Sequence, residues 1–260
     1  MCALVFVAFA LVVSTAVSDA RVKRSAKKVA TATLERRPEK KSPKAEHEVA
    51  KAEKRAKPKS RGQSFGAPWS GRLVNATKFR APDRTYLRRP HRAFATRTTA
   101  QHTRQAIRDT LKSFPKAHAL AIGDFSAAQG GWISDHNSHQ SGRDVDLGLF
   151  FKVAPAGYPA SFIDADATTM HTAAMWSLIR NLANTADEDG GVQMMFLDFE
   201  LQGVIYKWAK QNGVSKARLD KVFQYPHGRG AAAGIVRHEP NHADHVHVRF
   251  RCAAAETSCR

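Results

Sequence analysis

Large apolar side chains are unevenly distributed along the chain, and this limits the part that can fold around a core. Residues 21–61 consist mainly of Lys, Arg, Ala, Glu and Pro, with 16 basic and 5 acidic residues. Such a segment buries too little apolar surface to offset the entropy lost on ordering. We therefore expect a disordered basic tail or linker at 21–61 and one folded domain at 62–260.

The N-terminal 20 residues have the features of an export signal. An apolar run at 2–17 is followed by small residues that suit a signal peptidase, which is typical of a cleaved secretory signal peptide at 1–20. No Lys or Arg precedes this run, so a retained membrane anchor is the alternative. No other stretch is long and apolar enough to engage a bilayer. We expect no stable membrane span after cleavage.

The folded part combines helical and strand patterns that do not repeat. A helix is predicted over 99–114, where Ile107, Leu111 and Phe114 recur at three- and four-residue spacing. Two further helices and four strands are predicted at 170–182 and 201–210, and at 119–122, 145–151, 192–197 and 244–250. Gly213 fits the end of the later helix. This mixture predicts a single α+β domain.

The last predicted strand alternates strictly between polar and apolar residues. His245, His247 and Arg249 occupy one face and apolar residues the other. Because side chains in a strand have period two, both imidazoles must point the same way. His242 and Asp244 place further proton-exchanging groups beside them. The alternation favours a functional site, although a chain with 12 histidines could carry this pair on an ordinary surface strand.

A second polar cluster, SDHNSHQSGRDVD, contains His136, His139, Asp144 and Asp146. Gly142 allows the backbone to turn between His and Asp, so one metal could be bound by both. Neutral imidazole and carboxylate suit zinc, and a site with three protein ligands keeps one position for water. Spacing does not choose between the two Asp residues, and a polar surface loop with incidental histidines is the alternative.

The two clusters together resemble a known family. SHQSGRDVD and HADHVHVRFRC are similar to the penicillin-insensitive murein endopeptidases, bacterial zinc peptidases of a wider group with an H-x6-D and an H-x-H motif. GAPWSGRLVNA, RRPHRAF, GDFSAAQGG and the spacing of Cys252 and Cys259 also resemble family segments. The resemblance covers 66–259 and implies a compact zinc-peptidase domain whose metal site lies on a small antiparallel sheet.

The resemblance also implies roles for individual residues. The implied zinc ligands are His139, Asp146 and His247, which leaves Asp144 as a structural or outer carboxylate. His245 takes the place of the catalytic histidine. His136 and His242 match histidines near the metal, as extra ligands, outer partners or proton relays; we expect His136 among the metal ligands and His242 among the catalytic residues. One zinc ion is expected.

The implied activity is hydrolysis of peptide cross-links in peptidoglycan, between D-alanine and diaminopimelic acid, by a zinc-activated water. A zinc carboxypeptidase or amidase acting on other wall amide bonds, and a non-catalytic wall-binding protein, are the alternatives. Arg237 and Arg249 are candidates for binding a peptide carboxylate, or ordinary ion-pair partners. Peptidoglycan as substrate, together with the export signal, implies secretion across the inner membrane into the periplasm.

Cys252 and Cys259 are the only cysteines left after signal cleavage. In an exported chain this pair predicts a disulfide, with two free thiols as the alternative. It would close a small loop directly after the predicted metal strand. No G-x-S-x-G motif is present, which weighs against covalent acyl transfer.

The net charge of +18 first suggests a nucleic-acid partner, because Lys and Arg neutralise phosphates. However, the tail carries +11 of this charge and the folded domain +8, with −1 in the signal. The tail does not interleave aromatic side chains for base stacking. We expect no nucleic-acid partner. The tail is predicted to tether the domain near the anionic wall; nucleic-acid binding by the tail alone, or a spacer without a partner, are the other interpretations.

Overall fold

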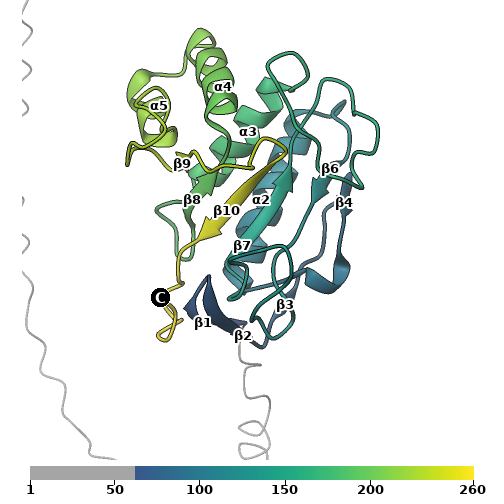
Figure 1. Cartoon of the computed structure of the whole chain (residues 1–260), viewed down its shortest axis with the longest axis vertical. Coiled ribbons are helices and arrows are strands. Elements are labelled where there is room, and N and C mark those ends of the chain that lie inside the picture. Colours follow the sequence, from purple (N-terminus) through teal and green to yellow (C-terminus); the bar gives the residue numbers. More distant parts are fainter. Residues whose placement is uncertain (1–61) are drawn as a thin grey trace, which may run out of the picture. The chain divides into compact units, whose positions relative to one another are not determined.

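A six-stranded mixed sheet organises residues 62–260, the part of the chain that this computed structural model describes (Figure 1). Its strands, in spatial order, are β4 (Thr85–Leu87), β6 (Leu120–Ile122), β7 (Asp144–Gly148), β10 (His245–Phe250), β8 (Val192–Phe196) and β9 (Val236–Arg237). The inner pairs are antiparallel, and the two edge pairs, β4 with β6 and β8 with β9, are parallel. The signal at 1–20 and the tail at 21–61 lie outside the described residues.

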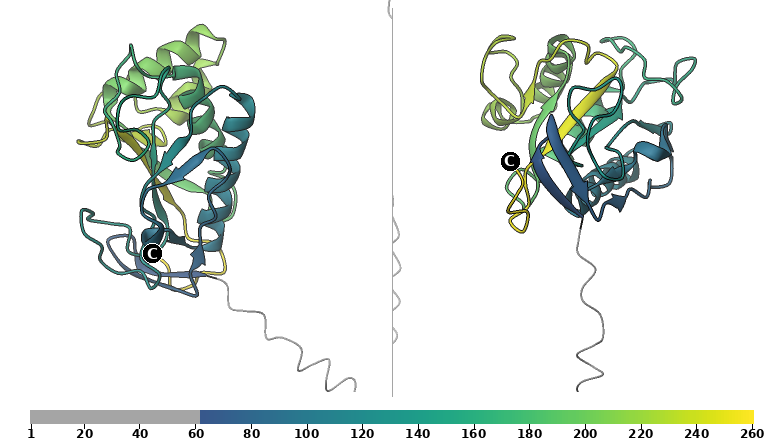
Figure 2. Two further views of the ribbon diagram at one scale, coloured as in Figure 1. Left: turned by 90° about the vertical axis from the view of Figure 1, so that its right-hand side faces the viewer. Right: turned by 60° about the horizontal axis from the view of Figure 1, so that its bottom comes forward.

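Four α-helices accompany this sheet in the described part of the chain: α2 (Arg97–Ser113), α3 (Thr172–Ala183), α4 (Phe199–Gln211) and α5 (Lys216–Val222). The Thr96 side chain caps α2 by accepting a hydrogen bond from Thr99 N, and α4 ends before Gly213, which has φ +82°. α2 packs against α3 on one face of the sheet (Figure 2). No helix within 62–260 has the length and apolar character needed to cross a membrane.

The central strand β10 separates the core from the polar face, as its alternation predicts. Val246, Val248 and Phe250 are fully buried, and Phe250 stacks on His102 of α2. His247, on the opposite face, lies outside this apolar core. The α+β prediction is confirmed. The sheet is larger than the expected small antiparallel one, because two- and three-residue parallel strands extend both edges.

The smaller strands form two separate two-stranded sheets. β1 (Gln63–Ala67) pairs with β2 (Ser70–Val74), and β3 (Thr77–Lys78) pairs with β5 (Phe94–Ala95). A short 3-10 helix, η1 (Pro90–Arg92), precedes β5. The C-terminal segment lies along β1, where Gly66 N donates to Ser258 O at 2.9 Å and Arg260 N donates to Gly66 O at 3.0 Å.

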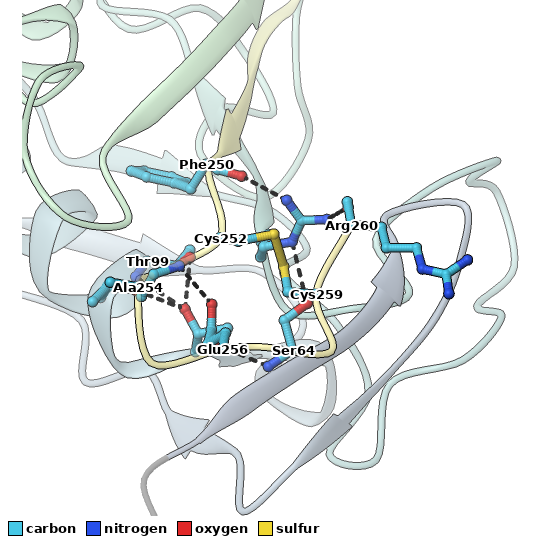
Figure 3. Close-up of a disulfide and its surroundings, with 12 residues drawn as sticks. Ser64, Thr99, Phe250, Cys252, Ala254, Glu256, Cys259 and Arg260 are labelled. Atoms are coloured by element: carbon cyan, nitrogen blue, oxygen red, sulfur yellow. Dashed lines mark hydrogen bonds between the residues drawn. A yellow bond between two sulfur atoms is a disulfide. The ribbon is translucent and has the colours of Figure 1, made fainter.

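The predicted disulfide joins Cys252 and Cys259 (Figure 3). Beside it, the Glu256 carboxylate accepts hydrogen bonds from Ser64 N at 3.0 Å and Ala253 N at 2.9 Å. Arg143, which precedes β7, is buried nearby and donates to Ser64, Phe250 and Arg260. The C-terminal loop is therefore anchored both to β1 and to the start of the strand that carries Asp144 and Asp146.

We expect the double variant Cys252→Ala/Cys259→Ala to lose about 2–3 kcal/mol of unfolding free energy, because the disulfide restricts the unfolded chain over a short loop. Urea unfolding of oxidised protein measures the loss. The wild type treated with reductant should unfold like the double variant. Equal stability of the oxidised wild type and the double variant would contradict a stabilising role for this bond.

Candidate metal centre

Strand pairing brings two of the predicted ligands together. In the β7–β10 register His247 lies opposite Asp146, and Arg249 lies opposite Asp144. Side chains directly opposite on antiparallel strands share a face and have Cβ atoms about 5 Å apart. His247 Nδ1 lies 3.0 Å from Asp146 Oδ1. One rung of the sheet therefore joins residues separated by 101 positions in the sequence.

The third predicted ligand comes from the loop before β7. His139 has φ +65° and Gly142 has φ +74°, so the loop turns sharply twice. A left-handed backbone at a non-glycine residue costs about 1–3 kcal/mol and is maintained by its surroundings. Here His139 N donates to Asp144 Oδ2 at 3.0 Å, and His139 Nδ1 donates to Phe125 O at 2.8 Å. The second bond leaves Nε2 of His139 free to face the site.

The three ligand atoms form a compact triangle. His139 Nε2 lies 3.2 Å from His247 Nδ1 and 3.3 Å from Asp146 Oδ1. A tetrahedral zinc ion with bonds of about 2.0–2.1 Å would separate its ligand atoms by about 3.3 Å. All three residues are at least nine-tenths buried. Two imidazole nitrogens and a carboxylate oxygen thus lie close together, a set of donor atoms that fits a metal cation.

His136 borders this triangle. Its Nδ1 lies 3.8 Å from Asp146 Oδ2, and the ligand atoms of His136, His139 and Asp146 all lie within 4.8 Å of one another. His136 Nε2 lies 2.9 Å from Asp124 Oδ2, on the side away from Asp146. The Asp124 carboxylate therefore holds the His136 ring through Nε2 and leaves its Nδ1 facing Asp146.

The electrostatics of this cluster favour a cation at its centre. Burial raises the pKa of Asp146, but the charges and hydrogen bonds of His139 and His247 outweigh this effect and hold the pKa well below its usual range. Asp144 behaves in the same way, through His247 and Arg249. Burial lowers the pKa of His247, yet the two carboxylates raise it to about 9. Both carboxylates are therefore anionic and attract positive charge.

Asp144 lies between His247 and Arg249 and contacts both. Its Oδ1 lies 3.5 Å from Nε2 of His247, and its carboxylate accepts two hydrogen bonds from the Arg249 guanidinium at 2.8 and 3.2 Å. Arg249 is thus the ordinary ion-pair partner considered above, because its guanidinium fork is used within the protein. Arg237, the other candidate, donates from Nε to Gly234 O.

Asp124 was not identified by the sequence analysis, although it holds several residues of the site in place. It is fully buried and contacts Arg89 at 2.8 Å, Arg92 at 3.0 Å and His136 at 2.9 Å. Burial raises the pKa of Asp124, but hydrogen bonds from His136 and Arg92 and the charge of Arg89 lower it overall. The available signal was a lone acidic residue one glycine after the apolar strand at 119–122.

The two predicted catalytic histidines lie beside the triangle. Nδ1 of His245 lies 2.5 Å from Asp244 Oδ1, and its Nε2 lies 3.8 Å from Asp146 Oδ1. His242 lies next to it, with ring centroids 4.7 Å apart, and donates from Nδ1 to Pro240 O. Burial lowers the pKa of His242, which favours its neutral form.

Comparison with known protein families gives a match that includes several of these site residues. Residues 66–200, more than half of the chain, match the model of the penicillin-insensitive murein endopeptidases. No curated protein was found to match the sequence. The matched segment contains His136, His139 and Asp146, whereas His247 lies beyond its end and reaches the same point through β10. The match extends over more than half of the chain, and it places this protein in the penicillin-insensitive murein endopeptidase family, a family of peptidases.

Proposed function

We propose that this protein is a zinc metallo-endopeptidase that hydrolyses the D-alanyl to diaminopimelyl cross-links of peptidoglycan. The observation that carries the proposal is the buried triangle of His139, Asp146 and His247 in a member of a murein endopeptidase family. Two nitrogen ligands and one oxygen ligand suit zinc, and three protein ligands are the usual number in catalytic zinc sites. His136 stands beside them as an additional ligand.

When bound, zinc lowers the pKa of water and polarises the scissile carbonyl. The protein supplies the proton transfers. Asp244 holds Nδ1 of His245, so Nε2 is the atom that takes up a proton during attack and passes it to the leaving amine. His242 donates from Nδ1 to Pro240 O, which leaves its Nε2 as a neutral acceptor beside His245. No serine or cysteine nucleophile takes part in this mechanism.

Digestion of a purified, cross-linked muropeptide dimer tests the proposed reaction. Separation of the products should show conversion of dimer to monomers, dependent on metal and lost on chelation. Release of terminal D-alanine without monomers would instead identify a carboxypeptidase, and cleavage between glycan and peptide would identify an amidase. Binding to the wall without any product would identify a wall-binding protein. Each of these three results would overturn the endopeptidase proposal.

The substitution Asp124→Asn should weaken zinc binding about 10–100-fold, because outer carboxylates orient metal-binding histidines. The neutral amide cannot form the ion pairs that Asp124 makes with Arg89 and Arg92. It also holds the His136 ring less firmly than the carboxylate does. Competition with a chelator measures the affinity. Asp135→Asn is the matched control, since Asp135 also contacts Arg89 but is largely exposed. Equal affinities of the two variants would contradict the role given to Asp124.

We also propose that the domain at 62–260 acts in the periplasm after export and cleavage of 1–20. The apolar run at 2–17 and the small residues after it support export. The +11 charge of 21–61 supports attraction to anionic wall polymers. Mass spectrometry of the protein recovered from the periplasm would give the N-terminus, and a mass that includes 1–20 would indicate a retained anchor.

A further inference from the structure

Within 62–260, one arginine close to the candidate metal centre forms no ion pair. Arg89 and Arg92 both contact Asp124, whereas Arg88 forms no ion pair with any carboxylate within 62–260. Its backbone is fixed by a hydrogen bond from Arg88 N to Ile122 O at 2.9 Å, and its Nε donates to Ala160 O at 3.0 Å. The terminal nitrogens of the guanidinium are not used by these contacts.

Phe162 connects Arg88 to the proposed catalytic histidine. The Arg88 guanidinium carbon lies 4.1 Å from the Phe162 ring centroid, and the Phe162 ring stacks on His245 with centroids 5.1 Å apart and planes inclined by 12°. A side chain at Gly123 would place Cβ 2.7 Å from Phe162 Cζ, so the absence of a side chain there admits the ring. The Phe162 ring therefore contacts both the Arg88 guanidinium and the His245 imidazole.

Carboxylates of the candidate metal centre act electrostatically on Arg88. Burial and the charge of Arg89 lower the pKa of Arg88, while the carboxylates of Asp124, Asp244 and Asp146 act in the opposite direction. These carboxylates all lie around the metal-binding triangle. A half-buried guanidinium without a bound anion is poorly compensated, and its planar fork matches a carboxylate in two hydrogen bonds.

We propose that Arg88 binds a carboxylate of the peptide substrate, the free carboxylate of the diaminopimelyl residue whose amine leaves. This inference rests on the proposed endopeptidase reaction. That carboxylate is joined to the carbon that bears the scissile nitrogen, so it accompanies the amine that His245 protonates. Arg88 thereby selects cross-links that carry a free carboxylate over those in which it is amidated.

The test compares two purified dimers that differ only in a carboxylate or a carboxamide at this position. The wild type should cleave the carboxylate dimer with a kcat/KM about 10–100-fold higher, as expected for a hydrogen-bonded charge pair. Arg88→Gln should lose this preference by slowing only the carboxylate reaction. Arg88→Lys should keep part of it, because the charge is retained without the fork. Arg108→Gln, an exposed arginine on α2, removes the same charge elsewhere and should behave as the wild type.

Binding separates this inference from the proposed reaction. The full-length protein treated with chelator is titrated with each intact dimer, and the carboxylate dimer should bind more tightly only where Arg88 is present. Such selective binding without any cleavage by the metal-loaded enzyme would support Arg88 and refute the endopeptidase reaction. Equal binding of the two dimers by the wild type would overturn the inference. A loss in Arg88→Gln that is the same for both dimers would also overturn it, and would show that Arg88 only positions Phe162 and His245.

Discussion

Replacement of His247 by alanine is expected to abolish the proposed zinc binding and, with it, the proposed cleavage of cross-linked dimers. The variant removes His247 Nδ1, which lies 3.2 Å from His139 Nε2 and 3.0 Å from Asp146 Oδ1. His136, the remaining additional ligand, does not replace it in the triangle, because its Nδ1 lies 3.8 Å from Asp146 Oδ2. Loss of the metal removes several kcal/mol of transition-state stabilisation, so kcat/KM should fall about a thousandfold or more. Metal analysis of the purified variant and the dimer assay measure both effects.

His91→Ala is the matched control, because His91 is exposed in η1 and is not part of the triangle. It should retain one zinc per chain and full activity. Circular dichroism of both variants verifies that they are folded. A His247→Ala protein that still binds one zinc and cleaves the dimer would refute the assignment of His247.

Replacement of His245 by alanine should differ from that of His247 in metal content alone, with metal retained and activity lost. His245 Nε2 is 3.8 Å from Asp146 Oδ1, and the triangle forms without it. General acid–base catalysis contributes about 10²–10⁴-fold, so kcat should fall by this factor while zinc content stays at one per chain. The loss should fall on kcat more than on KM, since the proton moves only during reaction.

Asp244→Asn separates orientation from proton transfer. The amide keeps a partner for Nδ1 of His245 but removes the negative charge, so its kcat should lie between those of the wild type and His245→Ala. If His245→Ala lost its zinc as well, His245 would have to be counted as a ligand. Unchanged kcat in His245→Ala would assign the proton transfer to another group, with His242 the nearest candidate.

The sequence predicted the elements whose side chains have a clear period. The helix expected at 99–114 is α2 at Arg97–Ser113, and the strand expected at 244–250 is β10 at His245–Phe250. Alternation of apolar and polar residues in β10 was sufficient to predict which residues face the core. The two edge strands were not predicted: β4 has three residues and β9 has two, too few to display any period, and both depend on pairing with distant strands.

The site was predictable only in part, because several contacts depend on register. Periodicity placed His245 and His247 on one face, but spacing left Asp144 and Asp146 equivalent. In the structure Asp146 lies opposite His247 while Asp144 lies opposite Arg249. A one-residue difference in register would exchange the faces of the whole strand. The pairing of β7 with β10 is not visible in either segment alone, so an ion pair of Arg249 was one of two interpretations, but Asp144 was not predicted as its partner.

The central position of β10 has a consequence for when the protein becomes active. β10 is the last strand in the sequence, yet it lies between β7 and β8, and its His247 is 108 residues from His139. Such distant contacts form late and slowly compared with local ones. Any part of the chain that stops before residue 247 holds His139 and Asp146 but not the complete candidate metal site. The candidate metal site is therefore completed only when nearly the whole domain is available to fold.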